Sequence, residues 1–189
     1  MKNLPYLLLI LLMAGFRWPA HAQQVDDASD GQSKLRLTSS QQAAVNAFLR
    51  THADFQVANC ATLNRNHDEC MAEREEWRRL VKEQNAIPQY QFAVWGDFRH
   101  RGVNDLTIPF FSRHAVNNWN WRQWDIVVLK ATASGRYTPL VALTGTWGTC
   151  FDGILYHPAR KQVEFWCKSM GGSIRWTGTE YLGHLRTGD

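Results

Sequence analysis

The four cysteines are the residues whose types and spacing restrict the possible chemistry most. They form two sequence-close pairs, Cys60 with Cys70 and Cys150 with Cys167. A thiolate metal site needs cysteine or histidine at Cys-x-x-Cys-like spacing, which neither pair shows. Paired cysteines in a small exported domain are typical of disulfides. We therefore predict two structural disulfides, each closing a loop of about ten to twenty residues and contributing about 3 kcal/mol to stability.

The second pair can be placed on a hairpin. Strands are expected at residues 149–157 and 162–169, with a turn at Pro158-Ala159. A two-residue or four-residue loop there pairs residues whose numbers sum to 317, as those of Cys150 and Cys167 do. These two cysteines are therefore expected to face each other directly across an antiparallel pair.

Residues 96–108 contain two acids, Asp97 and Asp105, with two arginines between them, Arg99 and Arg101. Guanidinium groups cannot ligate a cation, but each can donate paired hydrogen bonds to a carboxylate. We expect these arginines to pair with Asp97 and Asp105 and to hold a hairpin closed.

The same stretch resembles the loop of FG-GAP and VCBS-type repeats, in which one strand ends in Gly-Asp-Phe and the next begins after Gly-x-x-Asp-Leu. The resemblance implies a strand-loop-strand unit and a calcium site built from oxygens at alternate positions. It makes Asp97 and Asp105 the calcium candidates, but the third and fifth ligand positions are Arg99 and Arg101. We therefore expect no metal and no other cofactor. Because the motif occurs once, it does not predict a propeller, which repeats its motif in each blade.

A tryptophan-rich stretch at residues 114–124 could recognise a ligand. It interleaves Trp119, Trp121 and Trp124 with asparagines and Arg122. Aromatic faces can stack on a sugar ring or anchor a protein interface, while amides supply hydrogen bonds. The alternative is that Trp121 and Trp124 begin a strand and pack in the core. Trp119, Trp121 and Arg122 are the binding candidates, and Trp119 is expected to be the most exposed.

A second candidate surface lies in the C-terminal hairpin, residues 167–181. Its small residues beside a disulfide resemble, in texture, the loops with which small periplasmic lysozyme inhibitors enter an enzyme cleft. An ordinary tight turn is the alternative. If this hairpin binds a partner, Ser173 and Arg175 are the expected contacts.

Asp152 is the carboxylate most open to a catalytic role. It is expected opposite Phe165 on a mostly apolar strand face, where a carboxylate needs a partner or a raised pKa. An ion pair with Arg175 or another arginine is one interpretation, and catalysis with His157 or His114 is the other. No nucleophile elbow, zinc-protease helix or phosphate-binding loop accompanies it, so we predict no catalytic residue.

The N-terminal residues predict that the rest of the chain is exported from the cytoplasm. Residues 1–22 have the features of a signal peptide: Lys2, an apolar run at residues 7–14, and the cleavage sequence Ala20-His21-Ala22. The apolar run is shorter than the roughly 20 residues that span a bilayer. We predict cleavage near Ala22, release into the periplasm, and no membrane span after cleavage.

The remaining 167 residues suit one domain. They carry 19 basic and 17 acidic side chains, because residues 1–22 contain two of the 21 basic residues and no acid. A net charge of +2 is too even to indicate a nucleic-acid partner. Residues 23–38 are polar and are predicted to form a flexible arm, and residues 39–189 a single disulfide-bonded α+β domain.

The pattern of that domain predicts two N-terminal helices followed by an antiparallel β-meander of seven or eight strands. Ser39 and Gln42 resemble a capping box that begins a helix at residues 40–51, and a second amphipathic helix is expected at 70–84. The strands are expected at residues 90–98, 106–112, 124–131, 137–144, 149–157, 162–169, 173–177 and 180–185.

Export, paired cysteines and aromatic loops without catalytic motifs favour a non-enzymatic periplasmic domain that binds a protein. An inhibitor or immunity protein against a cell-wall hydrolase or a secreted effector is the leading hypothesis. The alternatives are a module that binds peptidoglycan or another glycan through Trp119 and Trp121, and a hydrolase that uses Asp152 or a histidine.

Overall fold

Two antiparallel sheets form the centre of the molecule. The computed structural model describes residues 35–84, 90–148, 150–167 and 170–186. Their elements, in chain order, are α1 (Ser39–Thr51), β1 (Phe55–Val57), α2 (His67–Glu83), β2 (Val94–Gly96), β3 (Asp105–Ser112), β4 (Arg122–Ala131), β5 (Tyr137–Trp147), β6 (Gly153–His157), β7 (Gln162–Cys167), β8 (Met170–Trp176) and β9 (Tyr181–Arg186).

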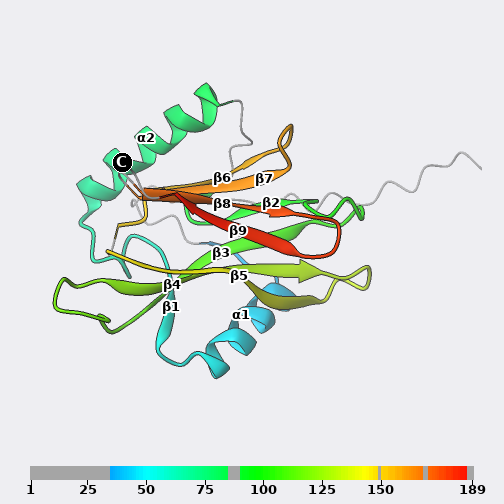
Figure 1. The fold of residues 1–189 in the computed structure, drawn as a ribbon, viewed down its shortest axis with the longest axis horizontal. Helices are drawn as coiled ribbons and strands as arrows, with labels where there is room; N and C mark the ends of the chain where they lie inside the picture. Colours follow the sequence, from blue (N-terminus) through cyan, green and yellow to red (C-terminus); the bar gives the residue numbers. More distant parts are fainter. Residues whose placement is uncertain (1–34, 85–89, 149, 168–169, 187–189) are drawn as a thin grey trace, which may run out of the picture.

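The two sheets are stacked, and each has a helix on its outer side (Figure 1). The first sheet has the order β1-β3-β4-β5, with β2 also paired to β3, and the second has the order β6-β7-β8-β9. Helix α1 packs on β4 and β5, while α2 packs on β6. Every strand pair is antiparallel. The result is a four-layer arrangement, α1, first sheet, second sheet, α2.

The core lies between the sheets. All residues of β3 are buried, so this strand is covered on both faces, by the second sheet on one side and by α1 and its neighbours on the other. A series of stacked aromatic rings crosses the interface, with Trp124 against Trp147 at a centroid distance of 5.3 Å and against Phe151 at 5.4 Å. Phe165 of the second sheet continues it against Phe151 at 6.2 Å.

Helix α1 begins one residue earlier than the sequence predicts. Thr38 is the N-cap, and its hydroxyl accepts the Gln41 N–H while the Gln41 side chain accepts the Thr38 N–H. This is the reciprocal capping box expected at Ser39 and Gln42, displaced by one position. Within the described part of the expected arm, Leu35 and Leu37 pack against the core. Residues 23–34 of that arm and the predicted signal peptide lie outside the described residues.

Helix α2 is held to β6 through Trp77. The indole Nε1–H donates to the Ile154 carbonyl at 3.0 Å, and Trp77 and Val81 pack on Leu155. Gly153 permits this approach, because a Cβ there would lie 2.4 Å from Cδ1 of Trp77. Within the described residues, no helix is long and apolar enough to cross a membrane.

The α+β class is confirmed, but its finer description is wrong in two respects. Strand β1 lies between the helices, so they do not both precede the sheet, and the described residues form nine strands rather than seven or eight. The meander also divides, because the chain leaves the first sheet after β5 and starts the second at β6. A single sheet could not cover β3 and β4 on both faces, whereas two stacked sheets can.

Both predicted disulfides are present, with Cα–Cα distances of 5.9 Å for Cys60–Cys70 and 5.2 Å for Cys150–Cys167. The predicted register of the second pair is wrong: β6 and β7 pair Ile154 with Phe165, so paired numbers sum to 319. The turn occupies residues 158–161, and Cys150 precedes β6 instead of lying within the ladder. Two disulfides are typical of an extracellular or periplasmic protein.

Candidate functional site

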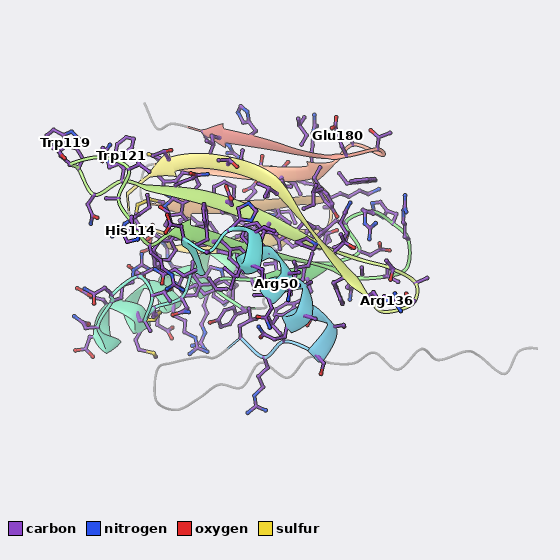
Figure 2. All side chains as sticks on the ribbon, turned by 90° about the horizontal axis from the view of Figure 1, so that it is seen from below. Arg50, His114, Trp119, Trp121, Arg136 and Glu180 are labelled. Carbon is purple, nitrogen blue, oxygen red and sulfur yellow. A yellow bond between two sulfur atoms is a disulfide. The ribbon has the colours of Figure 1, made fainter. Side chains whose placement is uncertain are left out.

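The β3–β4 connection, residues 113–121, projects from one end of the sandwich. We call it the tryptophan loop. Figure 2 shows Trp119 and Trp121 at this end, and Arg136 and Glu180 at the opposite end. The strand register gives the same placement. Arg122, which follows the loop at the start of β4, pairs with Trp147 at the end of β5, whereas Ala131 and Tyr137 pair at the other end of the same ladder.

The tryptophan loop is braced by hydrogen bonds of its own. The Asn117 side-chain oxygen accepts the backbone N–H of Trp119 at 3.0 Å and of Trp121 at 3.2 Å. The Val116 N–H donates to the Trp121 carbonyl at 2.7 Å, closing the base of the loop. Asn120 has a φ of 58°, in the left-handed region that asparagine tolerates. The loop is therefore held in one shape without a partner.

This bracing presents apolar side chains to solvent. Trp119 is 82% exposed, Val116 53% and Trp121 42%, whereas Trp124 is fully buried. The expectation that Trp119 is the most exposed tryptophan of this stretch is confirmed. The core interpretation holds for Trp124 but not for Trp121. Neighbouring exposed apolar side chains of this size make the loop a candidate interaction surface.

Arg122 lies at the root of the loop. Its guanidinium donates to the Asn120 side chain at 3.2 Å and to the Ser112 carbonyl at 3.4 Å. The neighbouring His114 lies 3.5 Å from Asp54. The three predicted contacts Trp119, Trp121 and Arg122 are thus brought together, on a base anchored by buried Trp124.

Ser173 and Arg175 are placed elsewhere. Both belong to strand β8, which includes most of the strand expected at residues 173–177, with Ser173 between Glu164 and His184, and Arg175 between Gln162 and Leu182. Arg175 is exposed and Ser173 half-buried. They lie on a sheet surface and do not extend the tryptophan loop. Residues 168–169, which connect β7 to β8, lie outside the described residues.

The expected pairing of arginine with carboxylate in residues 96–108 holds for Arg99. Its Nε and one terminal nitrogen each donate to Asp105 at 2.6 Å. Asp105 is fully buried and also accepts the Ala131 N–H at 2.7 Å and the Tyr181 hydroxyl. Asp97 instead accepts the backbone N–H groups of Arg101 and Gly102, both at 2.8 Å.

This network does not fit calcium. Both carboxylate oxygens of Asp105 already accept hydrogen bonds, two of them from a guanidinium whose charge would repel a cation. The hydrogen bond to Asp105 raises the pKa of Arg99. Burial, followed by the hydrogen bond to Asp105, raises the pKa of Tyr181 far above its ordinary value. The Arg99–Asp105 ion pair is therefore structural, because both carboxylate oxygens of Asp105 already accept hydrogen bonds from protein groups.

Asp152 forms the structural ion pair that was one of its two interpretations, but with Arg65 and not Arg175. The distance from the Arg65 guanidinium to Asp152 is 3.5 Å, and the same guanidinium donates to the Phe151 carbonyl and pairs with Glu73. Burial raises the pKa of Glu73 above its usual range. His157 lies instead beside Glu164, at 3.3 Å.

A pocket of about 400 Å³ lies where three turns meet, and the sequence did not indicate it. Its walls come from residues 98–101, from Lys161 in the β6–β7 turn, and from residues 176–178 at the end of β8. These segments are far apart in the chain, so no local pattern could have joined them.

No protein-family model, curated protein or solved structure matches this chain.

Proposed function

We propose that this chain is an exported periplasmic protein that binds another protein through the tryptophan loop and has no catalytic role of its own. The observation that carries the proposal is Trp119, an indole that is 82% exposed at the tip of a loop braced by Asn117. Tryptophan and arginine are the residues that most often dominate binding energy at protein interfaces. Here both types occur within one short loop and its root.

Loop shape supports the same conclusion. A flexible loop loses conformational freedom when it binds, and that loss reduces affinity. The hydrogen bonds from Trp119 and Trp121 to Asn117 hold this loop before any partner arrives. A protruding, preformed knob suits insertion into a cleft better than contact with a flat surface.

The partner we propose is a cell-wall hydrolase or a secreted effector with a hydrolase cleft. Enzymes that cleave glycosidic bonds carry a pair of carboxyl groups in the cleft. Arg113, the first residue of the tryptophan loop, and Arg122, which directly follows it, supply the complementary charge. Insertion of Trp119 would then block access to the carboxyl pair, which is the action of an inhibitor or immunity protein.

The test is capture followed by inhibition. The mature domain is immobilised and exposed to periplasmic and effector-containing lysates, and a captured hydrolase is then assayed on cell-wall sacculi with added domain. We expect wild type to capture a stoichiometric partner and to inhibit it, and Trp119→Ala to do neither. Leu182→Ala, which removes a 47% exposed side chain from β9, is the matched control and should behave as wild type. Absence of a stoichiometric partner, or equal capture by Trp119→Ala, would contradict the proposal.

A glycan ligand is the second candidate, and the exposure of both Trp119 and Trp121 favours it. Two aromatic side chains on one loop, with the Asn120 amide between them, can stack on and hydrogen-bond to sugar rings. This function predicts that the mature domain sediments with purified sacculi and that a Trp119→Ala, Trp121→Ala double variant does not. The two candidates separate because sacculi contain no protein partner.

A further inference from the structure

The pocket at the end of the sandwich remote from the tryptophan loop is positively charged. Arg99, Arg101 and Lys161 line it together with His100. The charge of Arg99 is balanced by Asp105, but within the described residues the side chains of Arg101 and Lys161 form no hydrogen bond or ion pair. Two cationic side chains without an ion-pair partner therefore line the same pocket.

Asp97, an acid in the same loop as Arg101, does not form an ion pair with the Arg101 guanidinium. Asp97 directs its two carboxylate oxygens to the backbone N–H groups of Arg101 and Gly102. These bonds fix the loop that carries Arg101, and Gly102 completes the turn with a φ of 71°. The guanidinium of Arg101 is left exposed to solvent.

The other walls are equally well defined. The Lys161 N–H donates to the Pro158 carbonyl at 3.2 Å, and the Thr177 N–H donates to the Glu180 carbonyl at 2.9 Å. Trp176 is half-buried, and its ring packs on Tyr181 with a centroid distance of 5.0 Å. One wall of a preformed pocket is thus aromatic, and the others are basic.

These features together select a class of ligand. A phosphate monoester carries a charge of about −1.5 to −2 at neutral pH, which balances two cations, whereas a single carboxylate does not. The pocket volume of about 400 Å³ is within the range of small-molecule sites and exceeds the need of a bare ion. Trp176 lines the pocket and supplies an aromatic group against which an attached ring can pack.

We infer that this pocket binds a phosphate monoester carried by a ring, with Arg101 and Lys161 on the phosphate and Trp176 on the ring. A free sugar phosphate and a lipid headgroup with a phosphate monoester on its ring share this chemistry. The inference does not depend on the tryptophan loop, which lies at the opposite end of the molecule (Figure 2).

Calorimetric titration of the purified mature domain tests the inference, with glucose 1-phosphate, inorganic phosphate and glucose as probes. Glucose 1-phosphate should bind saturably, more weakly at high salt, and better than inorganic phosphate, while glucose should not bind. Arg101→Gln combined with Lys161→Asn should weaken binding at least tenfold. Asparagine is chosen because Lys161 has a φ of 53°. Arg136→Gln, an exposed arginine on the β4–β5 turn outside the pocket, is the matched control and should leave binding unchanged.

Sedimentation with phosphatidylcholine vesicles that contain either phosphatidylinositol or phosphatidylinositol 4-phosphate identifies the source of the phosphate, because only the second lipid carries a phosphate monoester on its ring. Binding of glucose 1-phosphate that the double variant loses supports the inference with a free ligand. Sedimentation that requires phosphatidylinositol 4-phosphate and that the double variant loses supports it with a lipid headgroup. No binding in either arm, or binding that the double variant retains, overturns it.

Discussion

Arg99 and Asp105 form a bidentate ion pair in which two guanidinium nitrogens each lie 2.6 Å from a carboxylate oxygen. The pair joins the β2–β3 loop to the first residue of β3, and Tyr181 adds a hydrogen bond from β9 in the other sheet. An arginine thus closes the loop at which the FG-GAP and VCBS resemblance implies a calcium ion.

Removing one partner of this pair should be costly. Asp105→Leu leaves the Arg99 guanidinium buried without its carboxylate, and we expect the free energy of unfolding to fall by about 3–5 kcal/mol. Urea denaturation measures it. Arg99→Met combined with Asp105→Leu removes both charges, so its loss should be clearly smaller than the sum of the two single losses. Additive losses would show that the two side chains are not coupled.

Stability should decrease at high pH because of Tyr181. Its pKa in the folded protein is raised above the ordinary 10.0, so the folded state holds the phenolic proton more tightly than the unfolded state. The contribution of Tyr181 to the free energy of unfolding is therefore complete below pH 10, the ordinary pKa. It is lost as the pH rises above that value, at up to about 1.4 kcal/mol per pH unit. Urea unfolding between about pH 9 and pH 11 measures the slope. Tyr181→Phe should show a shallower slope, although Tyr156, whose pKa burial also raises, keeps part of it. Equal slopes would contradict the assignment.

The close approach of α2 to β6 depends on Gly153. A methyl group there would lie 2.4 Å from Cδ1 of Trp77 and 3.0 Å from Cζ2 of Trp166, so Gly153→Ala must displace a ring. We expect a loss of about 1–3 kcal/mol in unfolding free energy. Gly148→Ala is the matched control, because its Cβ would meet no atom within 4 Å. Equal stability of the two variants would show that α2 moves without cost.

The disulfide Cys150–Cys167 joins the chain just before β6 to the last residue of β7. With a sequence separation of 17, the chain-entropy relation gives about 3 kcal/mol, which Cys150→Ser with Cys167→Ser should remove in urea denaturation. Thiol titration of the native protein should detect no free thiol. A measurable thiol in the secreted form would contradict the disulfide assignment.

Asn117 should strengthen binding to the partner by holding the tryptophan loop in shape, and not by contacting the partner itself. Asn117→Ala removes the acceptor for the Trp119 and Trp121 N–H groups, so the loop becomes flexible and must be ordered on binding. We expect roughly tenfold weaker binding to the captured partner, with unchanged thermal stability. Asn118→Ala alters a neighbouring exposed amide and is the control. Wild-type affinity in Asn117→Ala would indicate that bracing of the loop does not matter.

The sequence by itself determined the features that depend on neighbours along the chain. Apolar periodicity located both helices and most strands, and short separations identified both disulfides, at 10 and 17 residues. The pairing of Arg99 with Asp105 spans only six residues and was equally accessible. The exposure of Trp119 followed from the polar residues around it.

Only the tertiary structure decided the relationships between distant segments. The 319 register depends on a turn at residues 158–161, and a hydrophobic pattern with a period of two residues cannot distinguish it from 317. Arg65 meets Asp152 across 87 residues, and the basic pocket joins three separate turns. Such contacts arise from the stacking of two sheets, which periodicity does not encode. The arrangement that places the tryptophan loop and the pocket at opposite ends is therefore a property of the fold.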